Sequence, residues 1–211
     1  MTQTNLWTNA DHALKYLAKA DTVPQRTQGE SVLLEQVPKT VGRILDLGTG
    51  DGRLLGLLKI DRPQVQSVAI DFSPTMLAAV RQRFARDESV EIIAHNLDEN
   101  LPSLGQFDAV VSSLAIHHLT HDRKRSLYEE IFSLLVPGGI FCNFEHVASP
   151  TQNLHDRFLQ AVGVADEPDD PSNILLDVET QLKWLREIGF ADVDCYWKWL
   201  ELALLIGVKP D

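Results

Sequence analysis

The chain has 211 residues, of which 44% are hydrophobic and 23% are charged, and its formal net charge is −11. This size and composition favour one folded domain with a substantial core, or one domain with a small cap, and exclude wholesale disorder. The negative charge repels phosphate backbones and anionic lipid, so we expect neither nucleic acid nor a membrane as partner.

The first part of the chain predicts a helical cap. Residues 1–40 alternate short helical patterns with turn signals at Pro24, Gly29 and Pro38. We expect this cap to precede a main domain at residues 41–211. The first residues contain no basic region followed by an apolar run, so we expect no signal peptide. No apolar run is long enough to cross a bilayer.

The main domain begins with alternating strand and helix patterns. We predict strands at residues 41–47, 65–70, 90–94, 107–112 and 139–146, and helices at residues 54–60, 74–86 and 122–135. This alternation is typical of a parallel sheet with helices on both faces. Cys142 and Cys195 fall in strand-like runs, which favours core thiols in a reducing compartment over a disulfide and predicts a cytoplasmic protein.

The last third of the chain is less regular at first. Residues 148–177 include the acidic, proline-rich stretch 166–171, and we interpret them as a loop or partial lid between helical pieces. A helix at residues 178–188 then ends at Gly189. The apolar runs 190–197 and 200–208 are separated by only two residues, which predicts an antiparallel hairpin.

A glycine-rich turn follows the first predicted strand. Its glycines, Gly48, Gly50 and Gly52, would allow positive φ angles and a close approach of a ligand to the backbone. The spacing differs from the G-x-G-x-x-G of dinucleotide sites, and Asp51 would repel a pyrophosphate. No G-K-[ST] follows, which excludes a phosphate-binding P-loop. The turn therefore favours a nucleoside ligand without phosphates.

Two carboxylates at strand ends fit such a ligand. S-Adenosylmethionine (SAM) has no phosphate and carries an ammonium and a sulfonium, and Asp46 is placed to accept from the ammonium side. Asp71 ends the second strand, about 20 residues after the glycine turn, where an acid binds ribose hydroxyls. The alternatives are a turn carboxylate for Asp46 and a helix cap for Asp71, although Ser73 also suits that cap.

At this point the chain resembles the class I SAM-dependent methyltransferases. Residues 46–52 (DLGTGDG) look like that family's first motif, and Asp71 matches its ribose-binding acid. Residues 95–102, 107–113 with 117–119, and 134–139 are similar to later motifs, in family order. The likeness covers residues 40–208 and implies a Rossmann-like three-layer α/β/α sandwich. Its seven-stranded sheet would be mostly parallel with an antiparallel C-terminal hairpin strand.

The resemblance also implies a set of donor-binding residues. Asn96 departs from the family, which often has Asp there, but its carbonyl oxygen still accepts from the adenine amine, with Asp98 as a rival. Arg26 is either a partner of the donor carboxylate or a surface charge. The expected SAM-binding residues are Asp46, Leu47, Gly48, Gly50, Asp71, Phe72, Met76, Asn96, Leu97, Ser113, Tyr16 and Arg26.

The acceptor side is expected beyond the carboxyl ends of the fourth and fifth strands. Methyl transfer needs alignment of the acceptor and, for some acceptors, removal of a proton. We predict His117 as the base, oriented by Glu145, and His118 as a structural residue. The alternative is an acceptor that needs no base. Because no dense Cys/His cluster is present, we expect no metal.

These features predict an enzyme that transfers a methyl group from SAM to a small-molecule acceptor. Two alternatives stay open: an enzyme like carboxy-SAM synthase that modifies the donor, and a SAM-binding protein without catalysis. The sequence leaves a homodimer open and does not name the acceptor.

Overall fold

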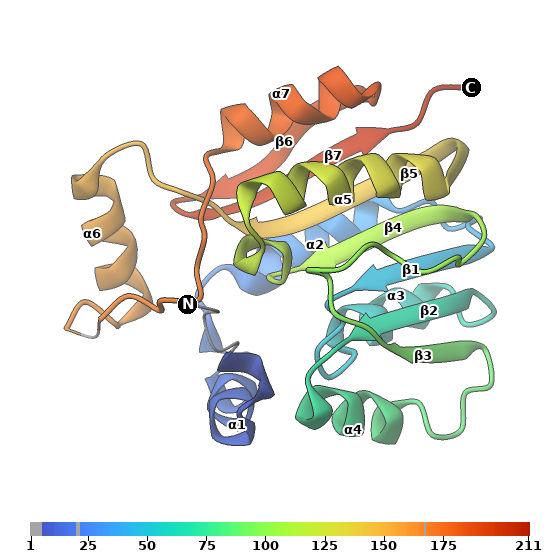
Figure 1. Cartoon of the computed structure of the whole chain (residues 1–211), viewed down its shortest axis with the longest axis horizontal. Helices are drawn as coiled ribbons and strands as arrows, with labels where there is room; N and C mark the ends of the chain where they lie inside the picture. The colour runs from blue at the N-terminus through green and yellow to red at the C-terminus, as the bar shows by residue number, and fades with distance from the viewer. Residues whose placement is uncertain (1–5, 20–21, 167) are drawn as a thin grey trace.

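The computed structural model describes residues 6–19, 22–166 and 168–211. One sheet in the order β3-β2-β1-β4-β5-β7-β6 forms the centre of the molecule (Figure 1). Only β7 runs antiparallel to its neighbours, β5 and β6. The predicted seven-stranded sheet with an antiparallel C-terminal strand is therefore confirmed. The strands are β1 (Arg43–Leu47), β2 (Gln66–Asp71), β3 (Val90–Ala94), β4 (Phe107–Ser113), β5 (Leu135–His146), β6 (Ala191–Trp199) and β7 (Leu202–Val208).

The central strands are apolar on both faces because helices cover both faces. Side chains alternate along β1, so Leu45 and Leu47 join one core cluster and Ile44 joins the other. The first cluster includes α5 (His121–Leu134) and α7 (Val178–Ile188), and the second includes α2 (Arg26–Gln36) and α3 (Arg53–Asp61). Figure 1 shows these pairs of helices on opposite sides of the sheet. This is the predicted three-layer sandwich.

Several boundaries differ from the sequence expectation. Helix α4 (Pro74–Arg83) ends three residues before the predicted Arg86, with Phe84 as its cap. Strand β5 begins at Leu135, directly after α5. The hairpin turns at Leu200 and Glu201, two residues later than expected, and Leu200 has a φ of +49°.

The irregular section after β5 contains helix α6 (Gln152–Val162), which projects to one side of the sheet (Figure 1). Thr151 caps its first turn by accepting from the Leu154 N–H, and Gly163 ends it in the left-handed conformation. Helix α7 has the same pattern, with Asp177 at its start and Gly189 at its end. Local sequence therefore defines both helices.

The N-terminal segment contains η1 (Leu6–Thr8), α1 (Ala10–Lys19) and α2. Gly29 was predicted as a turn signal, which is wrong, because it lies inside α2. A Cβ at Gly29 would lie 2.2 Å from Cε2 of Phe144 on β5, so glycine is what lets α2 approach the sheet. The division into a cap at residues 1–40 and a domain at residues 41–211 stays a prediction.

Cys142 is buried in the core, whereas Cys195 is only partly buried, and both are free thiols. Within the described ranges, none of the helices combines the length and hydropathy needed to cross a membrane.

Candidate functional site

A cavity opens at the carboxyl ends of β1, β2 and β4, where parallel sheets of this kind bind ligands. The space among its lining residues amounts to about 930 Å³, part of it open solvent. The cavity is lined by Trp7, Arg26, Asp46, Gly48, Thr49, Gly50, Asp51, Arg53, Leu54, Asp71, Phe72, Met76, His95, Asn96, Leu97, Asp98, Ser113, Leu114, Ala115, His118 and Leu119.

The glycine-rich turn forms the floor of the cavity. Gly48 has a φ of +66°, and a Cβ there would lie 2.2 Å from the Cβ of Ala115. Gly52 has a φ of +80°, and a Cβ there would lie 2.6 Å from the Phe84 ring. Only glycine satisfies both conditions without strain. The Thr49 N–H donates to the Ile70 carbonyl at 2.9 Å, which ties the turn to β2.

Asp71 joins the turn to the end of β2. Its Oδ2 accepts from the Gly50 N–H and its Oδ1 accepts from the Ser73 N–H, both at 2.9 Å. Burial raises the pKa of this carboxyl, while these backbone hydrogen bonds oppose the rise. Each carboxylate oxygen has a further lone pair, so Asp71 can still accept from hydroxyl groups in the cavity.

Asp46 has a buried oxygen without a partner. Its Oδ2 accepts from the Thr49 hydroxyl at 2.6 Å, but its Oδ1 has no hydrogen-bond partner. Burial raises the pKa of Asp46 to about 7, and the nearby Asp71, Asp51 and Glu30 add to the rise. A buried acceptor without a partner is unfavourable, and a cation in the cavity would correct it. The residues present therefore fit the cationic end of SAM.

Beyond Asp46, two arginines surround one carboxylate. Glu30, only 1% exposed, accepts from Arg26 Nε at 2.8 Å and from an Arg53 guanidinium nitrogen at 2.9 Å. The Ser113 hydroxyl lies 3.5 Å from the same carboxylate. Arg26 and Arg53 thus bring two guanidinium groups to this end of the cavity, and guanidinium groups are typical partners of a ligand carboxylate. Glu30 and Arg53 were not among the residues predicted for the site.

The opposite end of the cavity is lined by residues after β3. Asn96 Oδ1 accepts from the Asp98 N–H at 3.1 Å, so this acceptor already has one partner. His95 Nε2 is buried without a hydrogen-bond partner, and His95 lines the cavity. The Leu97 carbonyl accepts from Arg123 Nε at 2.6 Å, which fixes the segment against α5. His95 is a further polar group at the end where adenine is expected.

One strained residue lies between the two ends. Leu114 directly follows β4 and has a φ of +53°, which costs about 1–3 kcal/mol for a residue with a side chain. Its N–H donates to the Phe144 carbonyl at 2.8 Å, and its side chain lines the cavity. This conformation brings Ala115 against Gly48.

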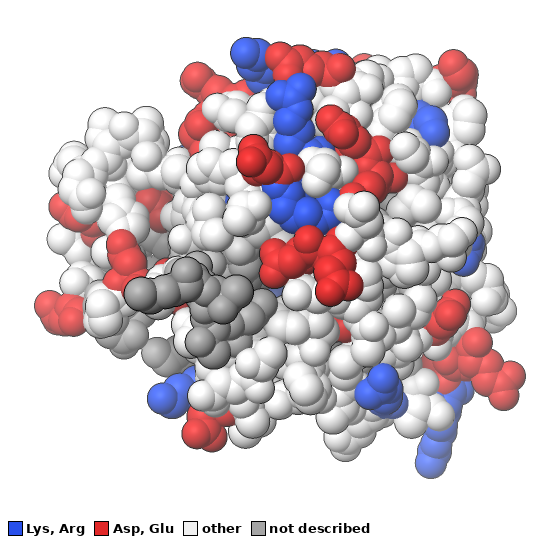
Figure 2. Space-filling model, in the orientation of Figure 1, with Lys and Arg blue, Asp and Glu red and all other residues white. Residues whose placement is uncertain are grey.

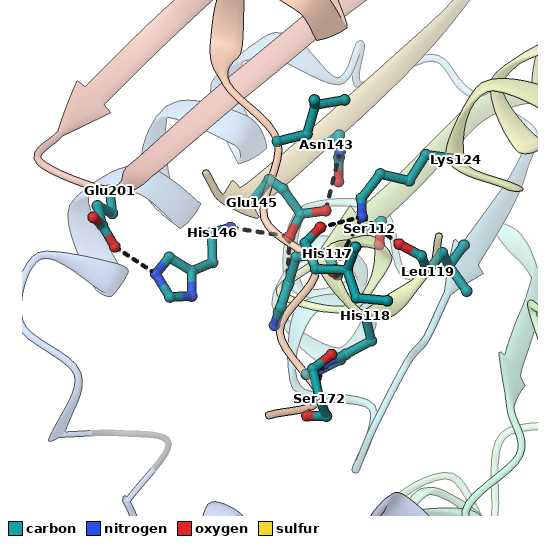
Figure 3. A network of polar contacts seen from close by, with 12 residues as sticks. Ser112, His117, His118, Leu119, Lys124, Asn143, Glu145, His146, Ser172 and Glu201 are labelled. Atoms are coloured by element: carbon teal, nitrogen blue, oxygen red, sulfur yellow. Dashed lines mark hydrogen bonds and ion pairs between the residues drawn. The ribbon is translucent and has the colours of Figure 1, made fainter. Parts of the chain in front are cut away.

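Behind this segment the structure brings His117 and Glu145 together, as Figure 3 shows. His117 Nδ1 lies 2.7 Å from Glu145 Oε1, and the two side chains are 8% and 0% exposed. Burial lowers the pKa of His117 well below 6.5, and burial raises the pKa of Glu145 to about 7. A neutral imidazole that donates from Nδ1 leaves the Nε2 lone pair available, which is the geometry of a base oriented by a carboxylate.

Buried groups support this pair. The Asn143 amide lies within 3.5 Å of Glu145 Oε2 and within 3.3 Å of the Tyr128 hydroxyl. Lys124, 1% exposed, donates through Nζ to the carbonyls of His117 and Ile174, at 3.1 Å and 2.5 Å. Burial lowers the pKa of Lys124 to about 8, whereas its attraction to Glu145 opposes the fall.

His118 occupies a different place from His117. Its Nδ1 lies 3.1 Å from the Ser172 carbonyl, and burial lowers its pKa to about 3. Its ring lies against that of His117, with centroids 3.9 Å apart and the ring planes tilted by 45°. His118 lines the cavity, whereas His117 is not among the lining residues. The roles of His117 as base and Glu145 as its orienting partner therefore stay predictions.

Most of the residues predicted to bind SAM line this cavity. Leu47 lies fully buried in β1, and the side chain of Tyr16 lies outside the described part of the chain. Among the described residues, no group of His, Cys, Asp and Glu is placed to hold a metal ion. The predicted SAM-binding residues found at the cavity are Asp46, Gly48, Gly50, Asp71, Phe72, Met76, Asn96, Leu97, Ser113 and Arg26.

Known proteins resemble this chain in sequence and fold. A family model described as a methyltransferase domain matches residues 44–139. Carboxy-S-adenosyl-L-methionine synthase of Desulforapulum autotrophicum is 31% identical over 187 residues, covering 80% of this chain and 75% of that protein. Demethylmenaquinone methyltransferase of Clavibacter sepedonicus is 33% identical over 168 residues, covering 72% of this chain and 66% of that protein.

A solved structure, human N-acetylserotonin methyltransferase in complex with SAM, has a TM-score of 0.69 and 19% identity. The match covers 98% of this chain and 58% of that one, so this chain spans little more than half of the longer protein. At this identity the likeness supports the fold alone.

Proposed function

Since this chain belongs to the class I SAM-dependent methyltransferases, we propose that it methylates a small-molecule acceptor. The observation that carries the proposal is the buried Asp46 Oδ1 without a partner, beside a glycine turn that contains an acid and no phosphate-binding lysine. A cationic, phosphate-free ligand satisfies that oxygen.

Each end of the cavity suits one part of SAM. Asp71, with free lone pairs on both oxygens, would accept from the ribose hydroxyls. Asp46 would face the ammonium, and Arg26 and Arg53 would hold the carboxylate. Asn96 and His95 would meet the adenine edge.

SAM supplies an electrophilic methyl group on a sulfonium. The protein therefore has to exclude water, align the acceptor and, where necessary, hold the acceptor's proton. We assign His117 Nε2 as the proton acceptor, with Glu145 fixing the tautomer and stabilising the imidazolium. Asn143 and Lys124 position Glu145 from behind.

Charge and surface favour a small acceptor over nucleic acid. The net charge is −11, and Figure 2 shows acidic side chains spread over the visible face, with the basic ones mostly beside them. This distribution offers no continuous basic surface on the face shown for a phosphate backbone. The two free thiols support a reducing, cytoplasmic location.

Calorimetry with SAM and S-adenosylhomocysteine (SAH) tests the donor assignment. We expect Asp46→Asn to weaken the binding of both SAM and SAH, because both carry the ammonium group that Asp46 would face. Asp87→Asn is the matched control, since Asp87 lies outside the cavity and bonds Ser89. Tight binding of NAD in place of SAM, or equal SAM affinity in Asp46→Asn and the wild type, would refute the proposal.

A second candidate is modification of the donor, as in a carboxy-SAM synthase. It is favoured by the 31% identical relative of that name and by the paired Arg26 and Arg53 at the carboxylate end. The mass of the product separates the two reactions, because methyl transfer releases SAH and donor modification yields a heavier sulfonium compound.

A further inference from the structure

A row of aromatic rings begins at the donor cavity and leads away from it. Trp7 and His118 line the cavity, and their ring centroids lie 5.2 Å apart. The next contacts are His118 with His117 at 3.9 Å, His117 with His146 at 5.6 Å, and His146 with Phe158 of α6 at 5.0 Å. Four separate segments of the chain thus bring rings into contact at interplanar angles of 40° to 68°, the tilted and edge-on arrangements in which an aromatic ligand also packs.

Two imidazoles in this row are held in the same way by buried carboxylates. His117 Nδ1 lies 2.7 Å from Glu145, and His146 Nε2 lies 2.9 Å from Glu201. Both carboxylate side chains are 0% exposed, whereas the His146 side chain is 17% exposed. In the neutral tautomer that donates to its carboxylate, each ring keeps one lone pair, on His117 Nε2 and on His146 Nδ1. The row therefore offers neighbouring acceptors for O–H or N–H groups.

The surroundings of the row are acidic. Glu201 also binds His155 Nδ1 at 2.8 Å, and the other His155 nitrogen lies 3.3 Å from Asp169. Lys124 Nζ, drawn in Figure 3, donates to backbone carbonyls. A negatively charged ligand would therefore lie beside Glu145, Glu201 and Asp169, while the nearby His155, whose pKa Glu201 raises, already pairs with two of these carboxylates.

We propose that the row of Trp7, His118, His117, His146 and Phe158 binds the methyl acceptor, and that the acceptor is an uncharged aromatic molecule with an O–H or N–H group. The proposal rests on the proposed function. In the reaction, the acceptor's O–H or N–H proton moves to His117 Nε2. A bond forms between the acceptor atom and the methyl carbon, while the sulfur–methyl bond breaks and its electron pair stays on sulfur, leaving SAH.

The test uses matched phenols that differ in charge. Binding of 4-methylphenol, catechol and 4-hydroxybenzoate is measured by calorimetry on the full chain saturated with SAH. We expect the neutral phenols to bind at least about tenfold more tightly than 4-hydroxybenzoate, because a carboxylate beside buried acids is unfavourable. A trans-alkene dicarboxylate serves as the aliphatic, anionic comparison.

Two variants locate the binding surface. His146→Phe keeps an aromatic ring but removes the lone pair. We expect this variant to bind catechol about tenfold more weakly, the effect of one hydrogen bond, and to bind SAH as the wild type does. His121→Asn is the control, because His121 bonds the Leu175 carbonyl outside the row and should leave both affinities unchanged.

Three outcomes would overturn the inference: tighter binding of the carboxylated compounds, no binding of any neutral phenol to the SAH complex, or wild-type catechol affinity in His146→Phe. Failure of SAH itself to bind would instead count against the proposed function, so the two failures are distinguishable.

Discussion

The proposed donor half and the proposed acceptor half of the site are built in different ways. The donor half consists of short segments that follow β1, β2 and β3, and its contacts involve backbone groups such as the N–H groups of Gly50 and Ser73. The proposed acceptor half is made of side chains from four segments, held by buried hydrogen bonds such as that between His117 and Glu145. Backbone geometry is encoded locally, whereas side-chain clusters depend on tertiary packing. The two halves should therefore respond separately to mutation.

The largest expected effect separates chemistry from donor binding. We expect His117→Ala to lower turnover to SAH by about 10²–10⁴-fold, the usual contribution of a general base, with SAM affinity unchanged. His121→Asn, another histidine near the start of α5, is the control. Turnover at the wild-type rate in His117→Ala would show that the acceptor needs no base there.

The complementary change acts on the donor half. We expect Asp71→Asn to weaken SAM binding by about 100-fold. The amide cannot accept hydrogen bonds from two ribose hydroxyls while it retains both backbone contacts. Equilibrium binding of SAM and SAH should fall in parallel, since both share the ribose. A loss confined to turnover would contradict the assignment of Asp71 to the ribose.

The pH should also affect SAM binding, through the carboxyl group of Asp46. Burial raises the pKa of Asp46 to about 7, and a cation favours its ionised form. Binding must therefore release a proton below pH 7, and SAM affinity should be about tenfold weaker at pH 6 than at pH 8. Calorimetry in buffers of different ionisation enthalpy measures the released proton, and Asp46→Asn should abolish the dependence.

The smallest effect concerns the rim of the acceptor half. Thr151 caps α6, so Thr151→Ala should lower the free energy of unfolding by about 1 kcal/mol. Denaturant unfolding measures this change. SAM affinity should not change, because α6 contributes no residue to the donor cavity. A weaker SAM affinity in this variant would show that the two halves are coupled.

The same difference between local backbone geometry and tertiary packing explains how much of each half could be predicted from the sequence. The strands and the positions of Asp46, Asp71 and the glycines could be predicted because strand ends are local signals and parallel strands present them at one edge. Glu30 could not be predicted as part of the site, since an Arg and a Glu four residues apart usually form an exposed helical pair. Gly29 was misread as a turn because its contact, Phe144, is distant in the sequence.

The acceptor half shows the same limit. His117 and Glu145 could be paired from strand positions, but Glu201 and His155 could not, because their meeting depends on how α6 packs against the β6–β7 turn. A single sequence does not reveal which carboxylates become buried.

The strained backbone at Leu114 has a consequence for engineering the enzyme. This residue lies between the segment that meets the donor and the histidines that follow it, and its bend holds Ala115 against Gly48. Replacing it with glycine would remove the steric penalty and let the peptide flip, so protein stability and catalytic alignment would change in opposite directions. Directed evolution for thermal robustness at this position should therefore select slower catalysts.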